Sequence, residues 1–215
     1  PSGNYTINVR DAQGCIDSVN LTLFQPNPIN ASFAPSTTLL TCFGDQNATI
    51  TVNNVTGGQG TNYTYTLNTI LPTPSSSGPQ TSNVFIDLGA GTYSVTINDG
   101  FNCEMTSVDI VISQPTQIQS SLVKETSQTC LTDASLTLSA NGGTGTYEYS
   151  NSVSFSTILG SFSSSVTFPV TSGTYQYYVR DANGCTVDVG GTITEPNALT
   201  GSITSQTNVD CFGNS

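Results

Sequence analysis

Alternating apolar and polar residues predict short half-buried strands along this chain. The clearest runs are residues 48–55 (ATITVNNV) and 134–138 (ASLTL). Each run is followed by a glycine pair, at 57–58 and 142–143, which is a turn signal. A Tyr-x-Tyr segment then places two rings on one face of the next strand. These pairs are Tyr63/Tyr65 and Tyr147/Tyr149.

Further strands are expected on both sides of these segments. They lie near residues 31–40, 83–88, 107–112 and 166–170. The Ser- and Pro-rich segment 71–82 and its counterpart 152–165 are expected to be irregular, as a surface loop or an edge strand. About seven short antiparallel strands at this density favour an immunoglobulin-like β-sandwich, and no helix of any length is expected.

One motif, G-x-Y-x-x-x-x-x-D-x-x-x-C, occurs three times with identical internal spacing. The copies are Gly3–Tyr5–Asp11–Cys15, Gly91–Tyr93–Asp99–Cys103 and Gly173–Tyr175–Asp181–Cys185. Such self-similarity is typical of a tandem array. The expected organisation is the tail of one repeat (1–28), two complete repeats (29–116 and 117–197) and the head of another (198–215). We therefore expect all-β, tandem immunoglobulin-like β-sandwich repeats arranged end to end as a rod, in an excerpt from a longer protein.

Charge and composition restrict the function. The net charge is −11, with only three basic residues, so a face that neutralises nucleic-acid phosphates is absent. No apolar run approaches the ~20 residues of a membrane span, so direct membrane insertion is not expected. Histidine is absent from the sequence, and no carboxylate outside the motif recurs between repeats. The prediction is a non-catalytic chain without a cofactor.

The aspartate of the motif (Asp11, Asp99, Asp181) has two interpretations. It could bind calcium, or it could accept hydrogen bonds from the backbone of its own tight turn. Calcium usually takes six or more oxygens and several carboxylates, whereas one acid recurs per turn. The sequence therefore favours a structural turn and no metal.

The tyrosines also have a structural interpretation. Those of the motif (Tyr5, Tyr93, Tyr175) stand where β-sandwiches place a corner tyrosine, at the start of the penultimate strand. The Tyr-x-Tyr pairs could stack on a sugar, but such pairs more often form half of a sandwich core, and the core interpretation is preferred.

The six cysteines are candidates for structural disulfides. They are Cys15, Cys42, Cys103, Cys130, Cys185 and Cys211. No two are close enough for a zinc motif, and one pair per repeat in a Ser/Thr-rich chain is typical of an oxidised extracellular protein.

Three pairings are open. The simplest is one bond inside each repeat, Cys42–Cys103 and Cys130–Cys185. In an immunoglobulin topology, however, those turns lie at opposite ends of the sandwich, about 25 Å apart, whereas a disulfide needs Cα atoms within about 7 Å. A bond across a junction would instead place Cys42 near Cys185. The near-constant spacings of 27, 27 and 26 residues would fit Cys15–Cys42, Cys103–Cys130 and Cys185–Cys211.

Several motifs in order resemble the SprB repeat of very large surface proteins of Bacteroidota. They are Cys-Phe-Gly at 42–44, Gly-Gly followed by Tyr-x-Tyr, and G-T-Y-x-V-x-x-x-D-x-x-G-C, best matched around 180–185. Two departures exist: the glycine is displaced to Gly100, and residues 130–132 read Cys-Leu-Thr. Asp17-Ser18-Val19 also resembles the short O-glycosylation motif of that phylum, which makes Ser18 a candidate acceptor.

The resemblance implies a secreted cell-surface filament or adhesin of the gliding-motility or surface-attachment type, exported across the outer membrane by type IX secretion. The implied partners are neighbouring repeats of the same chain, with surface polysaccharide or other cell-surface proteins as further candidates. The alternatives are an array of carbohydrate-binding modules and a passive spacer in a secreted multidomain enzyme.

Overall fold

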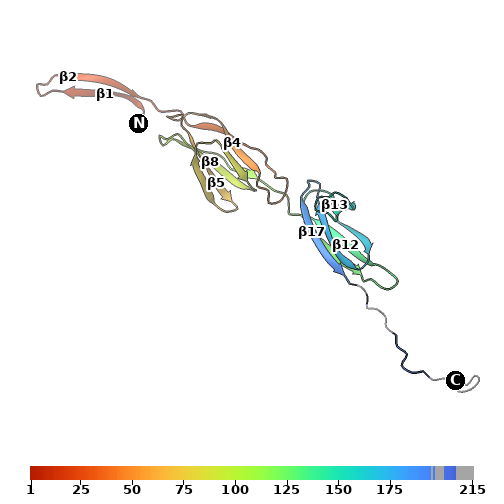
Figure 1. Ribbon diagram of the computed structural model, residues 1–215. Helices are drawn as coiled ribbons and strands as arrows, with labels where there is room; N and C mark the ends of the chain where they lie inside the picture. The colour runs from red at the N-terminus through yellow and green to blue at the C-terminus, as the bar shows by residue number, and fades with distance from the viewer. Residues whose placement is uncertain (195, 197–200, 207–215) are drawn as a thin grey trace, which may run out of the picture. The chain divides into compact units, whose positions relative to one another are not determined.

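The computed structural model describes residues 1–194, 196 and 201–206, which contain strands and no helix. This confirms the all-β prediction. No helix in the described part of the chain is long and apolar enough to cross a membrane. The chain divides into two compact units, Pro1–Gln117 and Ile118–Ser215 (Figure 1).

The first unit begins with a two-stranded hairpin. Strand β1 (Gly3–Arg10) pairs antiparallel with β2 (Ile16–Leu23) over eight residue pairs. Every residue of both strands is exposed, including the apolar residues Ile7 and Val19, which face each other across the pair. The hairpin has an alternating pattern and a closed turn, but no core of its own.

Residues 29–116 form a β-sandwich. One sheet has the order β3-β4-β7, and the other has the order β10-β8-β5-β6, with the short β9 also paired to β8. The strands are β3 (Asn30–Pro35), β4 (Ala48–Thr56), β5 (Thr64–Leu71), β6 (Ser75–Gln80), β7 (Val84–Leu88), β8 (Gly91–Asn98), β9 (Glu104–Thr106) and β10 (Ile110–Ile112). All these pairs are antiparallel.

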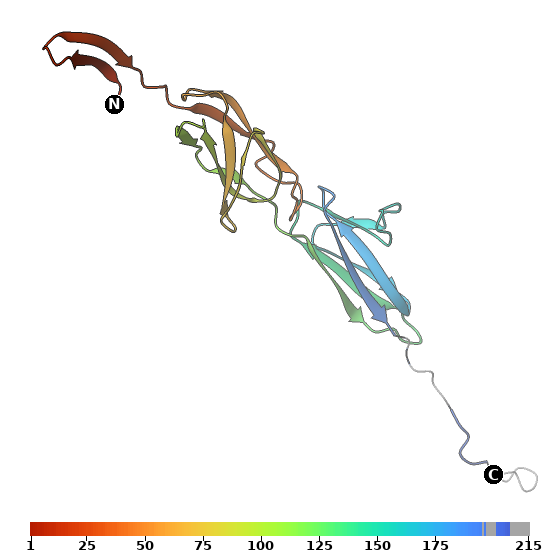
Figure 2. The same ribbon diagram turned by 60° about the vertical axis from the view of Figure 1, so that its left-hand side comes forward.

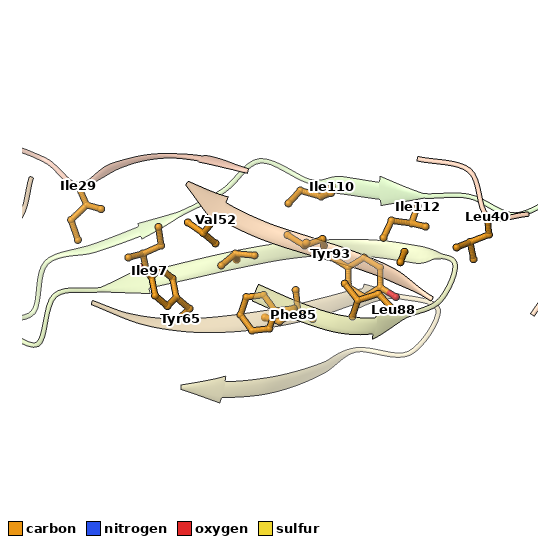
Figure 3. Close-up of a cluster of buried hydrophobic side chains, with 14 residues drawn as sticks. Ile29, Leu40, Val52, Tyr65, Phe85, Leu88, Tyr93, Ile97, Ile110 and Ile112 are labelled. Carbon is orange, nitrogen blue, oxygen red and sulfur yellow. The ribbon is translucent and has the colours of Figure 1, made fainter. Parts of the chain in front are cut away.

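Alternation along each strand builds the core of this sandwich. In β4 the side chains of Ala48, Ile50 and Val52 are buried, while their neighbours point outward. They pack in one cluster with buried residues of the second sheet, such as Val95 and Ile97 of β8. Figure 3 shows Leu40 and Ile112 at one end of this core, and Ile29 and Ile97 at the other.

The second unit repeats this arrangement. One sheet has the order β11-β12-β15 and the other β14-β13-β16-β17, with all pairs antiparallel (Figure 2). The strands are β11 (Gln119–Thr126), β12 (Ala134–Asn141), β13 (Tyr147–Ser150), β14 (Gly160–Phe162), β15 (Ser165–Val170), β16 (Gly173–Arg180) and β17 (Thr186–Ile193). Ala134 and Leu136 of one sheet pack with Ile193 of the other, so this unit is also a sandwich with its own core.

The structure decides or refines the sequence prediction in two segments. The Ser-rich segment 71–82 was expected to be a surface loop or an edge strand, and it contains β6, which pairs with β5 at the sheet edge, so the edge strand is the form observed. The strand expected at 107–112 forms only at Ile110–Ile112, as β10, and it is divided from the short β9 at Glu104–Thr106. The division falls at Ser107, whose N–H bonds to the Val95 carbonyl and whose Oγ accepts the Val95 N–H.

Candidate functional site

The turn between aspartate and cysteine has the same geometry in all three copies. In each, Oδ1 of the aspartate accepts two backbone N–H groups, from the residues two and four positions later. The distances are 2.9 and 2.8 Å at Asp11, 2.8 and 3.1 Å at Asp99, and 2.9 and 2.9 Å at Asp181. The aspartate N–H also donates to the cysteine carbonyl, which closes the turn. The carboxylate therefore satisfies N–H groups that the turn removes from the ladder.

The second carboxylate oxygen joins this turn to the glycine-pair turn of the same sandwich. Asp99 Oδ2 accepts the Gln59 N–H at 2.6 Å, and Asp181 Oδ2 accepts the Thr144 N–H at 2.8 Å. Gly58 and Gly143 have positive φ, and a Cβ on either would lie 2.7 or 2.6 Å from that oxygen. Glycine is required at these positions because the backbone must approach the carboxylate closely.

Both carboxylates are buried, with Asp99 exposed by 1% and Asp181 by 4%. The backbone N–H of Gln59 and those of Phe101 and Cys103 hold the pKa of Asp99 far below its usual range. A hydrogen bond to Asp99, together with burial, raises the pKa of the Cys103 thiol. The thiol therefore stays protonated at neutral pH and is a poor nucleophile.

This arrangement leaves little capacity for metal binding at the turn. Asp99 and Asp181 each accept three backbone hydrogen bonds. Within the described residues, no group of three or more His, Cys, Asp or Glu side chains could hold a metal ion. What the geometry can do is fix two turns of one sandwich against each other.

The motif tyrosines stabilise the start of the strand that leads to each aspartate, which is β1, β8 or β16. Each hydroxyl donates to the carbonyl four residues earlier: Tyr5 to Pro1, Tyr93 to Gly89 and Tyr175 to Thr171.

The Tyr-x-Tyr residues belong mostly to the cores, since Tyr65, Tyr147 and Tyr149 are buried. The Tyr63 hydroxyl donates to the Gly57 carbonyl, and the Tyr147 hydroxyl donates to the Gly142 carbonyl. Tyr149 stacks on Phe168 with centroids 5.7 Å apart, so its ring is occupied within the core.

The structure corrects the first-ranked cysteine pairing. Cys15, Cys103 and Cys130 are free thiols, whereas Cys42 and Cys185 are each disulfide-bonded. The in-repeat bonds Cys42–Cys103 and Cys130–Cys185 are therefore not formed. Two bonds of the constant-spacing set, Cys15–Cys42 and Cys103–Cys130, are not formed either. Cys211 lies outside the described residues.

Ser18 was singled out from the sequence, and Arg180 was not. Ser18 lies exposed in β2, and its N–H donates to Asp17 Oδ1. Sequence reasoning missed Arg180, whose guanidinium forms an ion pair with Glu148 at 2.7 Å and lies over the Phe155 ring. Because Arg180 and Glu148 are 32 residues apart in the sequence, no local pattern could have indicated the pair.

Comparison with known proteins gives a partial match. The family model described as the SprB repeat matches residues 34–71, which span the Cys42 loop, β4, the first glycine pair and β5. No curated protein matches the chain. Among solved structures, the chain is similar to the three N-terminal domains of the bacteriophage RB49 Highly Immunogenic Outer Capsid protein (Hoc), at 17% identity with a TM-score of 0.33. The similarity covers 77% of this chain, which spans 58% of that one.

Proposed function

The chain carries an SprB-repeat segment at residues 34–71, and from this premise we propose that it is a non-catalytic structural and adhesive part of a large secreted cell-surface filament or adhesin. The SprB repeat is a structural repeat family associated with cell-surface proteins. Gliding motility or surface attachment is the proposed setting, with export by type IX secretion.

One observation carries this proposal. The same constellation of turn aspartate and corner tyrosine recurs in every copy of the motif, and in each case its polar atoms are bonded to nearby backbone. A catalytic or ligand-binding centre would leave some of these groups directed at a substrate. Groups that repeat and are internally satisfied support a role in building copies of one stable fold.

Surface location is tested on intact cells that make this protein. A protease of broad specificity added to washed cells should release peptides from residues 29–197, while a cytoplasmic protein remains intact as the control. Recovery of these peptides only after lysis would contradict the proposal.

The structural role and the alternative of a carbohydrate-binding module are separated with the purified chain on a glycan array, alongside a lectin of known specificity as the positive control. A segment that only builds length gives no selective signal. Selective binding of one glycan class, lost on substitution of a surface residue, would replace the proposal with a carbohydrate-binding module.

A further inference from the structure

The β1–β2 hairpin has one apolar face, and that face is exposed. Residues that pair across the two strands share a face, so the alternation separates an apolar side from a polar side. The apolar side carries Tyr5, Ile7, Val9, Val19, Leu21 and Leu23, which are exposed by 37–65%. The other side carries mainly Asn, Thr and Ser. A two-stranded hairpin is marginally stable in water, so an apolar face of this kind indicates a binding surface.

The repeated motif shows what this face corresponds to in a complete sandwich. Counted from the motif glycine, the three apolar side chains of β1 correspond to three side chains of β8. These are Tyr93, Val95 and Ile97, exposed by 6%, 0% and 0%. The positions that are exposed in the hairpin are therefore core positions in residues 29–116.

The register extends this correspondence to the second strand. Tyr5 pairs with Leu21 where Tyr93 pairs with Ile110. The motif glycine pairs with Leu23 in the hairpin and with Ile112 in the sandwich. Figure 3 shows Ile110 and Ile112 in the core of residues 29–116.

The two faces also agree in size. The side chains of Ile7 and Val9 reverse the order of Val95 and Ile97, and leucine replaces isoleucine in the second strand. Such exchanges conserve volume, and sandwich cores tolerate them well. The hairpin therefore presents half of a core that matches the one in residues 29–116.

The corner that leads into the hairpin is already formed. The Tyr5 hydroxyl donates to the Pro1 carbonyl, as the Tyr93 hydroxyl donates to the Gly89 carbonyl. In the sandwich, Gly89 belongs to the two-residue connection that joins β7 to β8. Pro1 and Ser2 hold the same place relative to β1. The position of the strand that should come before the corner is thus fixed by the hairpin itself.

The first strand of the hairpin also has an open edge. Strand β8 lies between β10 and β5, and β16 lies between β17 and β13. Among the described residues, β1 pairs with β2 alone. A cover for the hairpin must therefore supply both a sheet for the apolar face and a strand for this edge.

We propose that the apolar face of the hairpin is the docking surface for a polypeptide segment of the same repeat type, continuous with Pro1, whose strands take the places of β3 to β7. The counterparts of β3, β4 and β7 cover the face, and the counterpart of β5 pairs with the open edge of β1. Residues 1–24 then supply one half of a sandwich core.

A graft of the chain's own strands tests this docking. Residues 29–88, which contain β3 to β7, are added ahead of Pro1 in the intact chain, with Cys42→Ser in the added copy. Hydrogen exchange of the β1 and β2 amides is compared with that of the unmodified chain. A lone hairpin opens readily and a sandwich opens rarely, so exchange should slow by at least about a thousandfold.

A longer graft shows whether added length alone has this effect. Residues 29–116 supply a complete sandwich, whose own β8 already fills the core. The hairpin amides should then exchange as fast as in the unmodified chain. Equal slowing by both grafts would contradict docking of the early strands.

Two neighbouring substitutions in the 29–88 graft test the face. Ile7→Asp places a charge on the apolar side and should abolish the slowing. Asn8→Asp places the same charge on the polar side and should preserve it. Slowing that survives Ile7→Asp would overturn the proposed surface.

A second graft guards against a fusion that misfolds. Residues 117–170 contain β11 to β15, the counterpart strands of the second unit, and are added with Cys130→Ser. Fast exchange of the hairpin amides in both grafts overturns the proposal. Slowing in the unmodified chain that grows with concentration, together with dimers in sedimentation, would instead assign the face to a second copy.

The exchange experiment is independent of the cellular one. Amide exchange in purified chains measures a contact of the hairpin, whereas protease treatment of cells measures location. Failure of this inference is therefore distinguishable from failure of the proposed function.

Discussion

At the scale of single residues, Asp99 makes stability depend on pH. Its carboxylate accepts three backbone N–H groups, which lower its pKa in the folded chain. A lowered pKa contributes stability above the unfolded value of about 3.9, and this stability is lost as pH falls through the folded value. Asp99→Asn should therefore lower the urea midpoint of residues 29–116 at pH 7. Below pH 4 the midpoint of the variant should fall less than the midpoint of the unmodified chain.

The control for this prediction is Asp109→Asn, which removes the same charge from an exposed position. Unfolding is followed at pH 7, 4 and 2.5. If both variants show the same pH dependence, net charge rather than the Asp99 turn sets acid stability.

The corner tyrosine gives a second prediction at this scale. Tyr175→Phe removes the 2.8 Å bond from the hydroxyl to the Thr171 carbonyl and keeps the ring. The expected loss is about 0.5–1.5 kcal/mol in the free energy of unfolding of the second unit. Tyr178→Phe, on the other face of β16, should cost less. Equal losses would show that the corner bond does not stabilise the fold.

Local spacing predicted these residues because their bonds are local. The Oδ1 contacts reach two and four residues along the chain, and the tyrosine hydroxyl reaches back four, so identical spacing implies identical geometry. The Oδ2 bond from Asp99 to Gln59 spans 40 residues and depends on strand order. No sequence period encodes that contact, and only the structure revealed it.

At the scale of elements, the glycine-pair turn needs glycine because its backbone lies close to a carboxylate, and not only because of its backbone conformation. Gly58 and Gly100 have similar φ, +77° and +80°, but only Gly58 faces a carboxylate, with a Cβ position 2.7 Å from Asp99 Oδ2. Gly100→Ala should cost about 1–2 kcal/mol from backbone strain. Gly58→Ala should cost about 1–3 kcal/mol more from the clash.

Hydrogen exchange locates the difference between these glycine variants. The Gln59 amide, which bonds to Asp99, should lose protection in Gly58→Ala and keep it in Gly100→Ala. Equal effects in both variants would mean that backbone conformation, and not the carboxylate, demands glycine.

Edge elements were the hardest to predict. Strand β6 reads SSSGPQ and pairs with β5 almost entirely through exposed residues. A strand without a buried face leaves no apolar alternation, so its sequence resembles that of a loop. The buried strands β4 and β12 followed their alternation closely, because one face of each meets the core.

At the scale of the whole molecule, the chain is built from two compact units, and each sandwich has a core of its own. The stability of such an array is close to a sum over its units, so one unit can unfold while the other stays folded. Tyr175→Phe should therefore weaken the second unit and leave the urea midpoint of residues 29–116 unchanged.

Single-molecule pulling of the reduced chain separates the two units. Each should unfold in its own event, and Tyr175→Phe should lower the force of only one of them. A single event that extends both units together would contradict independent cores.

The separate core of each sandwich also has a consequence for the gene. Duplication or loss of a whole unit leaves the core of every other unit intact. The number of units can then change during evolution without unfolding the rest, and the length of the protein becomes a heritable, adjustable quantity.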